Sequence, residues 1–544
     1  MKAKKISFTP EKIWNIVIFA FFAWFIFAFL IFPNLNTIVS VFFQDGQFTT
    51  VSFDKLIHSA KAMKSLRNSL ILAPALSITV GFVGISLVLI TEYFDIKGAK
   101  ILRLGYMTTL IYGGIILVSG YKFIYGKTGI LTTLFAKIIP SFPIDWFEGF
   151  WAVLFVMTFA CTSNHMIFLR NAMRAVDFQT VEAAQNMGAS QFRILTKVVL
   201  PVLTPSLLAV TILTFSGNVS SRPLAALLAL FLGVATILLL TVMIQIEKRG
   251  HYMSISKVKT TIIKQKIRNP ILNVLVHIYA YVLFLIYVIP VVLVVLFSFT
   301  DAATIASKKL TLSSFTLDNY ISIFQKATSY KPFVVSICYS AIAALLVAVI
   351  VLVACRIIQK RKDRLGSALE YGLLIPWLLP TTLMALGLIT TYNTPRFWML
   401  NRVLTGTSVI MLIGYMIIKI PFTLRMTKAA FFALDDSLED ASRNLGAKPL
   451  YTFLRVQLPI ILPTVLAIFA LNFNGLLGDY DMSVFMYHPL NQPLGVYIKS
   501  LTNSETNADN AALTFVYAVL MMVISSIVMY LVYGRGNKVD KREK

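Results

Sequence analysis

Two stretches of sequence decide the fold: AVDFQTVEAAQNMGASQFRILTKVVLP at 175–201 and ALDDSLEDASRNLGAKPLYTFLRVQLP at 433–459. With an ungapped offset of 258 residues, Gly188 aligns with Gly446, and both stretches close on Leu-Pro. A segment that recurs with constant internal spacing is the signature of an internal repeat. The chain is therefore predicted to consist of two homologous halves.

The composition around these stretches indicates a membrane protein. The 544 residues are 57% hydrophobic and 13% charged, whereas soluble domains average about 45–50% and about 25%. Apolar runs of about 20 residues, long enough to cross a bilayer as a helix, recur along the whole chain. The sequence excludes a soluble enzyme, a disulfide scaffold and a disordered protein, and it predicts an all-α, polytopic membrane protein.

We expect twelve spans, six in each half. The first half would occupy 1–246 and the second 271–534, joined by a basic linker at 247–270 and followed by a tail at 535–544. The expected spans are 13–33, 68–91, 102–121, 148–169, 202–219, 223–246, 271–299, 333–356, 367–390, 406–424, 460–477 and 511–533.

The net charge of +25 is explained by orientation in the membrane rather than by nucleic-acid binding. With the N-terminus inside, loops on that side hold about 33 Lys and Arg, and the opposite loops about 15. Cytoplasmic loops collect these residues, so both termini are predicted to lie in the cytoplasm. No basic face with interleaved aromatic residues points to a nucleic acid.

The duplicated segment lies between the fourth and fifth expected spans of each half, on the cytoplasmic side. A short helix would end at Gly188 or Gly446, because glycine tolerates the left-handed conformation that closes a helix. A second short helix would follow, and Pro201 or Pro459 suits the first turn of the next span. We expect a helix-turn-helix that serves as a docking surface; a purely structural re-entrant loop is the alternative.

These residues resemble the signature E-A-A-x3-G-x9-I-x-L-P of binding-protein-dependent ABC importer permeases. The first copy matches at Glu182, Ala183, Ala184, Gly188, Leu200 and Pro201. The second copy matches at Asp440, Ala441, Gly446, Leu458 and Pro459. It departs by carrying Asp440 for Glu and Ser442 for the second Ala, and both copies have Val for Ile. Two copies in one chain resemble the fused ferric-iron permeases.

The resemblance implies a type I ABC importer permease fold with a coupling loop in each half, at about 171–201 and 425–459. Two copies of a cytoplasmic ATPase subunit would dock there, and an extracytoplasmic solute-binding protein would deliver the substrate. The fusion favours ferric iron, with thiamine, 2-aminoethylphosphonate or a polyamine as alternatives. A gradient-driven secondary transporter is disfavoured, because the expected spans hold almost no carboxylates.

No catalytic, cofactor or metal residues are predicted. Gly126-Lys127-Thr128 lacks the upstream glycine of a phosphate-binding loop, since position 121 is Tyr121. The five histidines include no pair at i, i+4. The chain is therefore not expected to be an enzyme, and ATP hydrolysis is assigned to a separate subunit.

Four residues are candidates for the substrate pathway. Asp479, Tyr480 and Asp481 follow the eleventh expected span at its external end and offer hard oxygen ligands. His165 lies in the fourth expected span, where polar residues are candidates for function. Lys419, near the expected cytoplasmic end of the tenth span, is explained by snorkelling to the interface.

Overall fold

The computed structural model describes residues 10–536 in part. The residues left out within that range are 45–46, 51–53, 55–56, 111–113, 174–175, 177, 205–206, 208–263, 362, 378, 433, 435–436 and 504–507. Most of the expected span 202–219, all of the expected span 223–246, most of the linker and most of the tail lie outside the described residues.

The described chain is almost entirely helical. The first half contains α1 (Pro10–Phe25), η1 (Ile26–Ile31), α2 (Phe32–Phe42), the hairpin strands β1 (Phe43–Gln44) and β2 (Gln47–Phe48), α4 (Ala60–Val88), η2 (Leu89–Tyr93), α5 (Ala99–Tyr106), η3 (Thr108–Leu110), α6 (Gly114–Tyr125), α7 (Ile130–Ile138), α8 (Gly149–Met173), α9 (Phe178–Asn186), α10 (Gln191–Ile194) and η4 (Leu195–Val199).

The later part of the chain, from residue 270 on, is helical as well. It contains α13 (Pro270–Ser298), α14 (Ala302–Ser307), η5 (Leu312–Ser314), α15 (Asp318–Gln325), α16 (Ala327–Lys360), α17 (Arg364–Leu374), η6 (Ile375–Trp377), α18 (Thr381–Tyr392), η7 (Phe397–Met399), α19 (Ser408–Phe432), α20 (Ser437–Asn444), α21 (Pro449–Thr452), η8 (Phe453–Gln457), α22 (Leu458–Leu477), α23 (Ser483–Met486), α24 (Leu494–Asn503) and α25 (Ala508–Gly536).

Eight helices in the described part are long and apolar enough to cross a membrane, and each coincides with an expected span. They are Ile16–Thr37, Leu66–Tyr93, Gly149–Arg170, Pro270–Ser298, Ala327–Lys360, Ser408–Phe431, Pro449–Leu477 and Asn510–Val532. The prediction of an all-α polytopic membrane protein is therefore confirmed.

The third expected span of each half is not a straight helix, so the prediction of continuous spans there is wrong. Expected span 102–121 is divided among α5, η3 and α6, and the Thr108 hydroxyl donates to the Gly105 carbonyl at the break, 2.7 Å away. Expected span 367–390 bends by 103° between Arg364–Trp377 and Thr381–Tyr392. Pro380 stands at this bend, where it has no N–H to continue the helix.

The first helix of each half packs on the other half. The α13 helix contacts α5 and α6, and the Tyr106 hydroxyl donates to the Ala280 carbonyl at 2.7 Å. In the reciprocal arrangement, α2 lies along α18, and the Gly387 Cα lies so close to the Pro33 carbonyl that an added Cβ would be 2.9 Å from its oxygen. The two largest hydrophobic cores among the described residues each contain residues from both halves.

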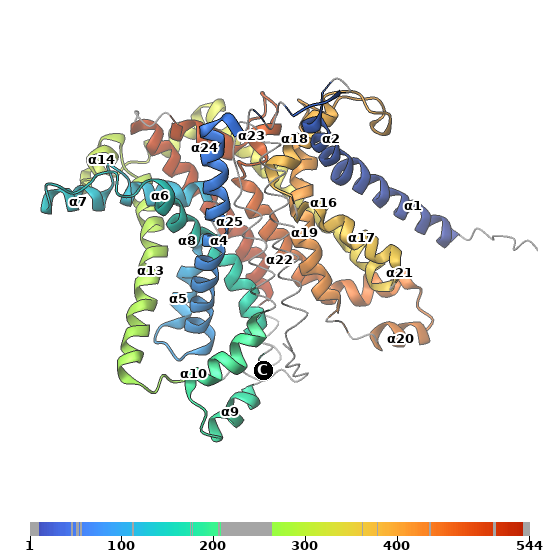
Figure 1. Cartoon of the computed structure of the whole chain (residues 1–544), viewed down its shortest axis with the longest axis horizontal. Helices are drawn as coiled ribbons and strands as arrows, with labels where there is room; N and C mark the ends of the chain where they lie inside the picture. Colours follow the sequence, from blue (N-terminus) through green and yellow to red (C-terminus); the bar gives the residue numbers. More distant parts are fainter. Residues whose placement is uncertain are drawn as a thin grey trace, which may run out of the picture.

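Figure 1 shows where the short helices lie relative to the spans. The helices α9 and α20 lie at the lower end of the molecule, whereas α7, α14 and α23 lie at the opposite end. The duplicated segments of the two halves therefore share one end of the helical bundle.

Candidate coupling surface and translocation pathway

The duplicated segment has the same local structure in both halves. A short helix, α9 or α20, is followed by Gly188 with φ +79° or Gly446 with φ +80°. An L residue with a side chain is strained at such φ values, which explains why glycine ends both helices. The expected pair of short helices with a glycine turn is therefore present in both halves.

The second short helix continues into the next span, which differs from the separate helix that we expected. The backbone N–H of Leu200 donates to Leu195 and that of Leu458 to Phe453, so one π-turn occupies the same repeat position in each half. Pro201 and Pro459, one residue further on, have no N–H for the regular helical ladder. The widened turn lets the helix pass through the proline instead of restarting there.

Most of the signature residues of the first helices face solvent. Glu182, Ala183, Asp440, Ala441 and both glycines are exposed, and Ala184 is half-buried. Leu200, Pro201 and Leu458 are half-buried at the start of the spans, while Pro459 is exposed. The two acids that we singled out are therefore free to meet another protein.

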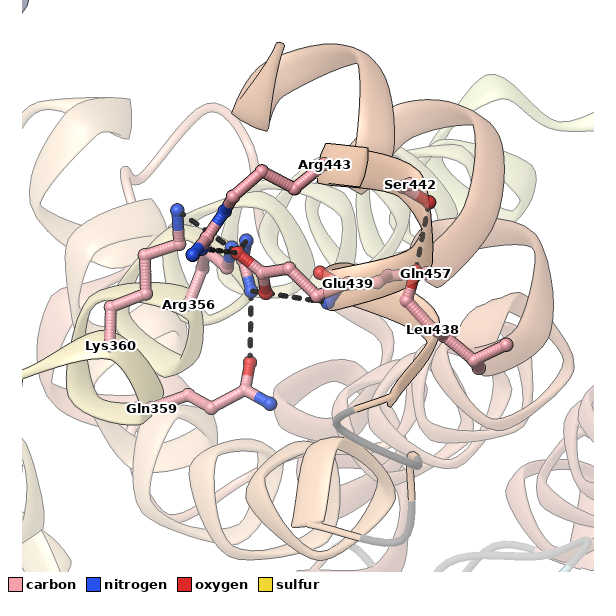
Figure 2. Close-up of polar contacts among 8 residues, drawn as sticks. All are labelled: Arg356, Gln359, Lys360, Leu438, Glu439, Ser442, Arg443 and Gln457. Carbon is pink, nitrogen blue, oxygen red and sulfur yellow. Dashed lines mark hydrogen bonds and ion pairs between the residues drawn. The ribbon is translucent and has the colours of Figure 1, made fainter. Parts of the chain in front are cut away.

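The helix α20 is anchored by Glu439, an acid outside the signature residues. Glu439 accepts hydrogen bonds from Arg356 Nη1 at 2.9 Å and Nη2 at 3.0 Å, and from Gln457 Nε2 at 3.1 Å (Figure 2). Lys360 Nζ lies 3.5 Å from the same carboxylate. The hydrogen bond from Arg356 is the main cause that lowers the pKa of Glu439. These contacts tie α20 to α16 and to the π-turn.

The helix α9 is anchored by apolar packing instead. Val181, which occupies the repeat position of Glu439, is fully buried. Neighbouring Phe178 is buried in the same core. An alignment of the two copies therefore pairs the hydrophobic anchor Val181 with the ionic anchor Glu439. In such an alignment Glu439 has no acidic counterpart, so its role as an anchor is hidden. The missed signal was the pairing of Glu439 with arginine and lysine near the end of the eighth expected span.

Large apolar side chains stand exposed beside both glycine turns. Met187 is 81% exposed and Leu445, its repeat equivalent, is 88% exposed. Phe192 and Leu450, a second equivalent pair, are exposed as well. In the second half, a hollow next to Leu445 is lined by Ser442, Leu445, Gly446, Ala447, Lys448, Tyr451 and Val456. Exposed apolar residues gathered in this way mark interaction surfaces.

The end of the linker between the halves is attached to the first coupling segment. Gln265 forms a β-bridge with Phe94, and its side chain accepts from Gln185 Nε2 at 2.6 Å. Gln191 donates to the Lys266 carbonyl, also at 2.6 Å. The segment at 264–268 therefore connects α9 and α10 to the end of the second expected span.

Of the two acids after the eleventh expected span, Asp479 is held by hydrogen bonds, whereas Asp481 is exposed. Asp479 Oδ2 accepts from the Ser483 N–H at 3.1 Å and the Ser483 hydroxyl at 2.7 Å. Burial raises the pKa of Asp479. Asp481 is solvent-accessible, yet the surrounding protein and the nearby Asp479 raise its pKa to about 6. Tyr480, between them, is half-buried.

Lys419 does not snorkel to the cytoplasmic interface, so that interpretation is wrong. It lies near the middle of span Ser408–Phe431. Its Nζ lies against Gly475, where an added Cβ would be 2.8 Å away. Gly475 is near the end of α22 that is remote from the coupling helices. The absence of a side chain at Gly475 provides the space for this ammonium group within the bundle.

His165 is placed away from the exposed surfaces. It is fully buried in α8 and packs against Gly84 of α4, where an added Cβ would lie 2.6 Å from the His165 Cβ. Among the described residues, no group of three or more His, Cys, Asp or Glu side chains is arranged to hold a metal ion. His165 as a pathway residue stays a prediction.

Comparisons with known proteins agree with this architecture. The family model "binding-protein-dependent transport system inner membrane component" matches residues 268–538. A probable ABC transporter permease protein of Sinorhizobium fredii, y4fN, is 36% identical over 537 residues, covering 93% of this chain and 94% of the relative. The chain therefore belongs to the binding-protein-dependent ABC transporter permeases, and it is a multi-pass membrane protein.

More distant relatives carry different substrates in their names. A putative ferric transport system permease protein of Haemophilus influenzae is 20% identical over 87% of this chain and 78% of its own length. A putative 2-aminoethylphosphonate permease of Salmonella paratyphi A is 26% identical over 44% of this chain and 90% of its own length. A bacterial alginate ABC importer of known structure aligns with a TM-score of 0.40 and 16% identity, over 49% of this chain and 96% of the matched chain.

Proposed function

We propose that this permease couples ATP hydrolysis to solute import through α9 and α20, each of which docks on one of two copies of a cytoplasmic ATPase subunit. One observation carries the proposal: at one end of the molecule, two segments with the same backbone expose Met187 and Leu445 at equivalent positions. A partner with two identical clefts fits such a pair of surfaces. Exposed Glu182 and Asp440 supply charges beside the apolar contact.

The remaining parts of the proposal follow from this docking. The coupling end is cytoplasmic, both chain termini lie on that side, and the opposite end receives an extracytoplasmic solute-binding protein. The halves 1–246 and 271–534 together enclose one pathway, and the linker at 247–270 keeps them in one chain. ATP is hydrolysed by the partner subunits.

The names of relatives support two substrates. Ferric iron, the first expectation from the sequence, is named for a relative that matches most of the chain. 2-Aminoethylphosphonate is named for a relative that matches one half. Thiamine and polyamines stay as alternatives without such support.

Site-specific cross-linking tests the docking. The permease, carrying Met187→Cys or Leu445→Cys, is expressed with its ATPase subunit, and the ATPase carries cysteines around its helical cleft. We expect disulfide-linked permease–ATPase products from both positions. Leu312→Cys, an exposed position on η5, is the matched control and should give none. Cross-links from Leu312→Cys but not from the coupling positions would refute the docking surface.

A further inference from the structure

A polar region separate from the surfaces of α9 and α20 lies inside the second half, around Gly475 on α22. Gly475 is exposed, although Asn474 and Leu476 on either side are buried. The exposed apolar residue Leu466 precedes it by nine residues, which is about 180° around an α-helix. The face of α22 that contains Gly475 therefore points away from the apolar, lipid-facing side.

Lys419 places its ammonium group on this inward face, because its Nζ contacts the Gly475 backbone. Among the described residues, no acidic oxygen lies within 4.0 Å of that nitrogen. A charged side chain at membrane depth is costly and marks a functional site by default. A compact lysine ammonium binds oxyanions as a point charge.

Asn474 adds a hydrogen-bonding group without a partner. Its side-chain nitrogen and oxygen are both buried and unsatisfied, and the residue is only 8% exposed. Asn472, two residues earlier, shows the ordinary arrangement, because its amide donates to Thr423 Oγ1 at 2.7 Å. An unsatisfied buried amide costs about 1–3 kcal/mol. This cost is removed when a ligand supplies the missing partner.

Two acids follow at the end of the same helix. Among the described residues, Asp479 and Lys419 form no ion pair within 4.0 Å. Asp479 is held by Ser483, whose hydroxyl is 2.7 Å from the Tyr415 hydroxyl. Asp481, beyond it, is accessible. The positive group of Lys419 and the negative groups after α22 thus do not neutralise each other in direct contact.

We propose that Lys419, Asn474 and Asp481 form a transient binding site for a small zwitterion, a solute that carries an oxyanion and an amine. Lys419 and the Asn474 amide bind the oxyanion, and Asp481 binds the amine. The inference rests on the proposed import function and specifies its substrate class. Ferric ion, thiamine and spermidine are cations that Lys419 repels, whereas an aminoalkyl phosphonate or an amino acid satisfies both ends.

Uptake by the complete importer tests this site. Cells expressing the permease with its ATPase and binding protein are given labelled 2-aminoethylphosphonate, a mixture of labelled amino acids, ferric ion or spermidine. We expect uptake of a zwitterion, lowered roughly tenfold or more by Lys419→Gln, since a charge-assisted hydrogen bond is lost. Lys419→Arg should retain part of the uptake. Lys331→Gln, at an exposed position of α16, should retain all of it.

A second variant protects the test against a folding defect. Gly475→Ala adds a Cβ that meets only the end of the Lys419 side chain, so it should displace the ammonium and lower uptake while the complex still assembles. Uptake of cations alone, uptake of none of the four solutes by a complex that assembles, or full activity of Lys419→Gln would overturn the zwitterion site and leave the coupling function standing. Failure of the ATPase to co-purify with the wild-type chain would instead refute the import function itself, and with it this inference.

Discussion

Glu439 on α20 accepts hydrogen bonds from both terminal guanidinium nitrogens of Arg356 on α16, at 2.9 and 3.0 Å. This pair joins a helix at the coupling end to one of the longest spans. Because the geometry is bidentate and both side chains are mostly buried, a force on α20 is transmitted to α16 through a stiff contact.

Removing Arg356 should loosen this connection. In Arg356→Ala, Glu439 keeps only Lys360, Gln457 and a distant Arg443. Breaking a buried pair from one side costs about 3–5 kcal/mol, and partial exposure here reduces the expected loss to roughly 1–3 kcal/mol. We expect a lower melting temperature of the purified permease and weaker coupling of ATP hydrolysis to uptake. Arg443→Ala is the control, since Arg443 is 71% exposed and 3.9 Å away; equal effects of both variants would contradict the anchor.

The same pair predicts a pH dependence in the acid range. The pKa of Glu439 is lowered in the folded protein, mainly by Arg356. Its stabilising contribution is therefore present above the ordinary glutamate pKa and is lost as pH falls through the lowered folded value. Hydrogen exchange of α20 should accelerate as pH falls through this window, after correction for the intrinsic rate. In Glu439→Gln that acceleration should be absent; if it persists, another acid is responsible.

The exposed apolar residues predict a loss of association without a loss of folding. Leu445→Asp puts a charge where the side chain is 88% exposed, so the free energy of unfolding should change by less than about 0.5 kcal/mol. The ATPase should nevertheless co-purify at least tenfold less, because a desolvated contact is lost. Leu312→Asp makes the same change at a 95% exposed position on η5. Equal ATPase retention by both variants would speak against docking at α20.

Asp481 predicts a pH profile of uptake. Burial and Asp479 raise its pKa from 3.8 to about 6. The carboxylate is thus mostly charged only above pH 6, and its ionisation removes folded-state stability as pH rises through that value. Uptake of an amine-bearing solute should increase across the same range, measured between about pH 5 and 8. Asp481→Asn should lower uptake and flatten the profile; an unchanged profile would assign the titration to another group.

The sequence predicted the features that depend on local chemistry. Apolar length predicted the helices that cross the membrane, and the repeat predicted the glycine turns at Gly188 and Gly446. Contacts between distant segments were not predictable in this way. Glu439 and Val181 occupy the same repeat position but reach different neighbours, so the alignment concealed the anchor. Lys419 was assigned to the interface because the sequence does not show that Gly475 leaves room for its ammonium group.

The exchange of first helices between the halves has a consequence for biogenesis. The helical segments α1, η1 and α2 leave the ribosome first. The elements that η1 and α2 pack against, α17 and α19 for η1 and α18 for α2, are synthesised more than 300 residues later. Until then this apolar helix, the span Ile16–Thr37, has only lipid and insertion machinery as neighbours. Neither half is a self-sufficient folding unit, because both large cores need residues from the other half. A product that ends after the first half therefore leaves apolar surface uncovered, and we expect membrane quality-control proteases to degrade it.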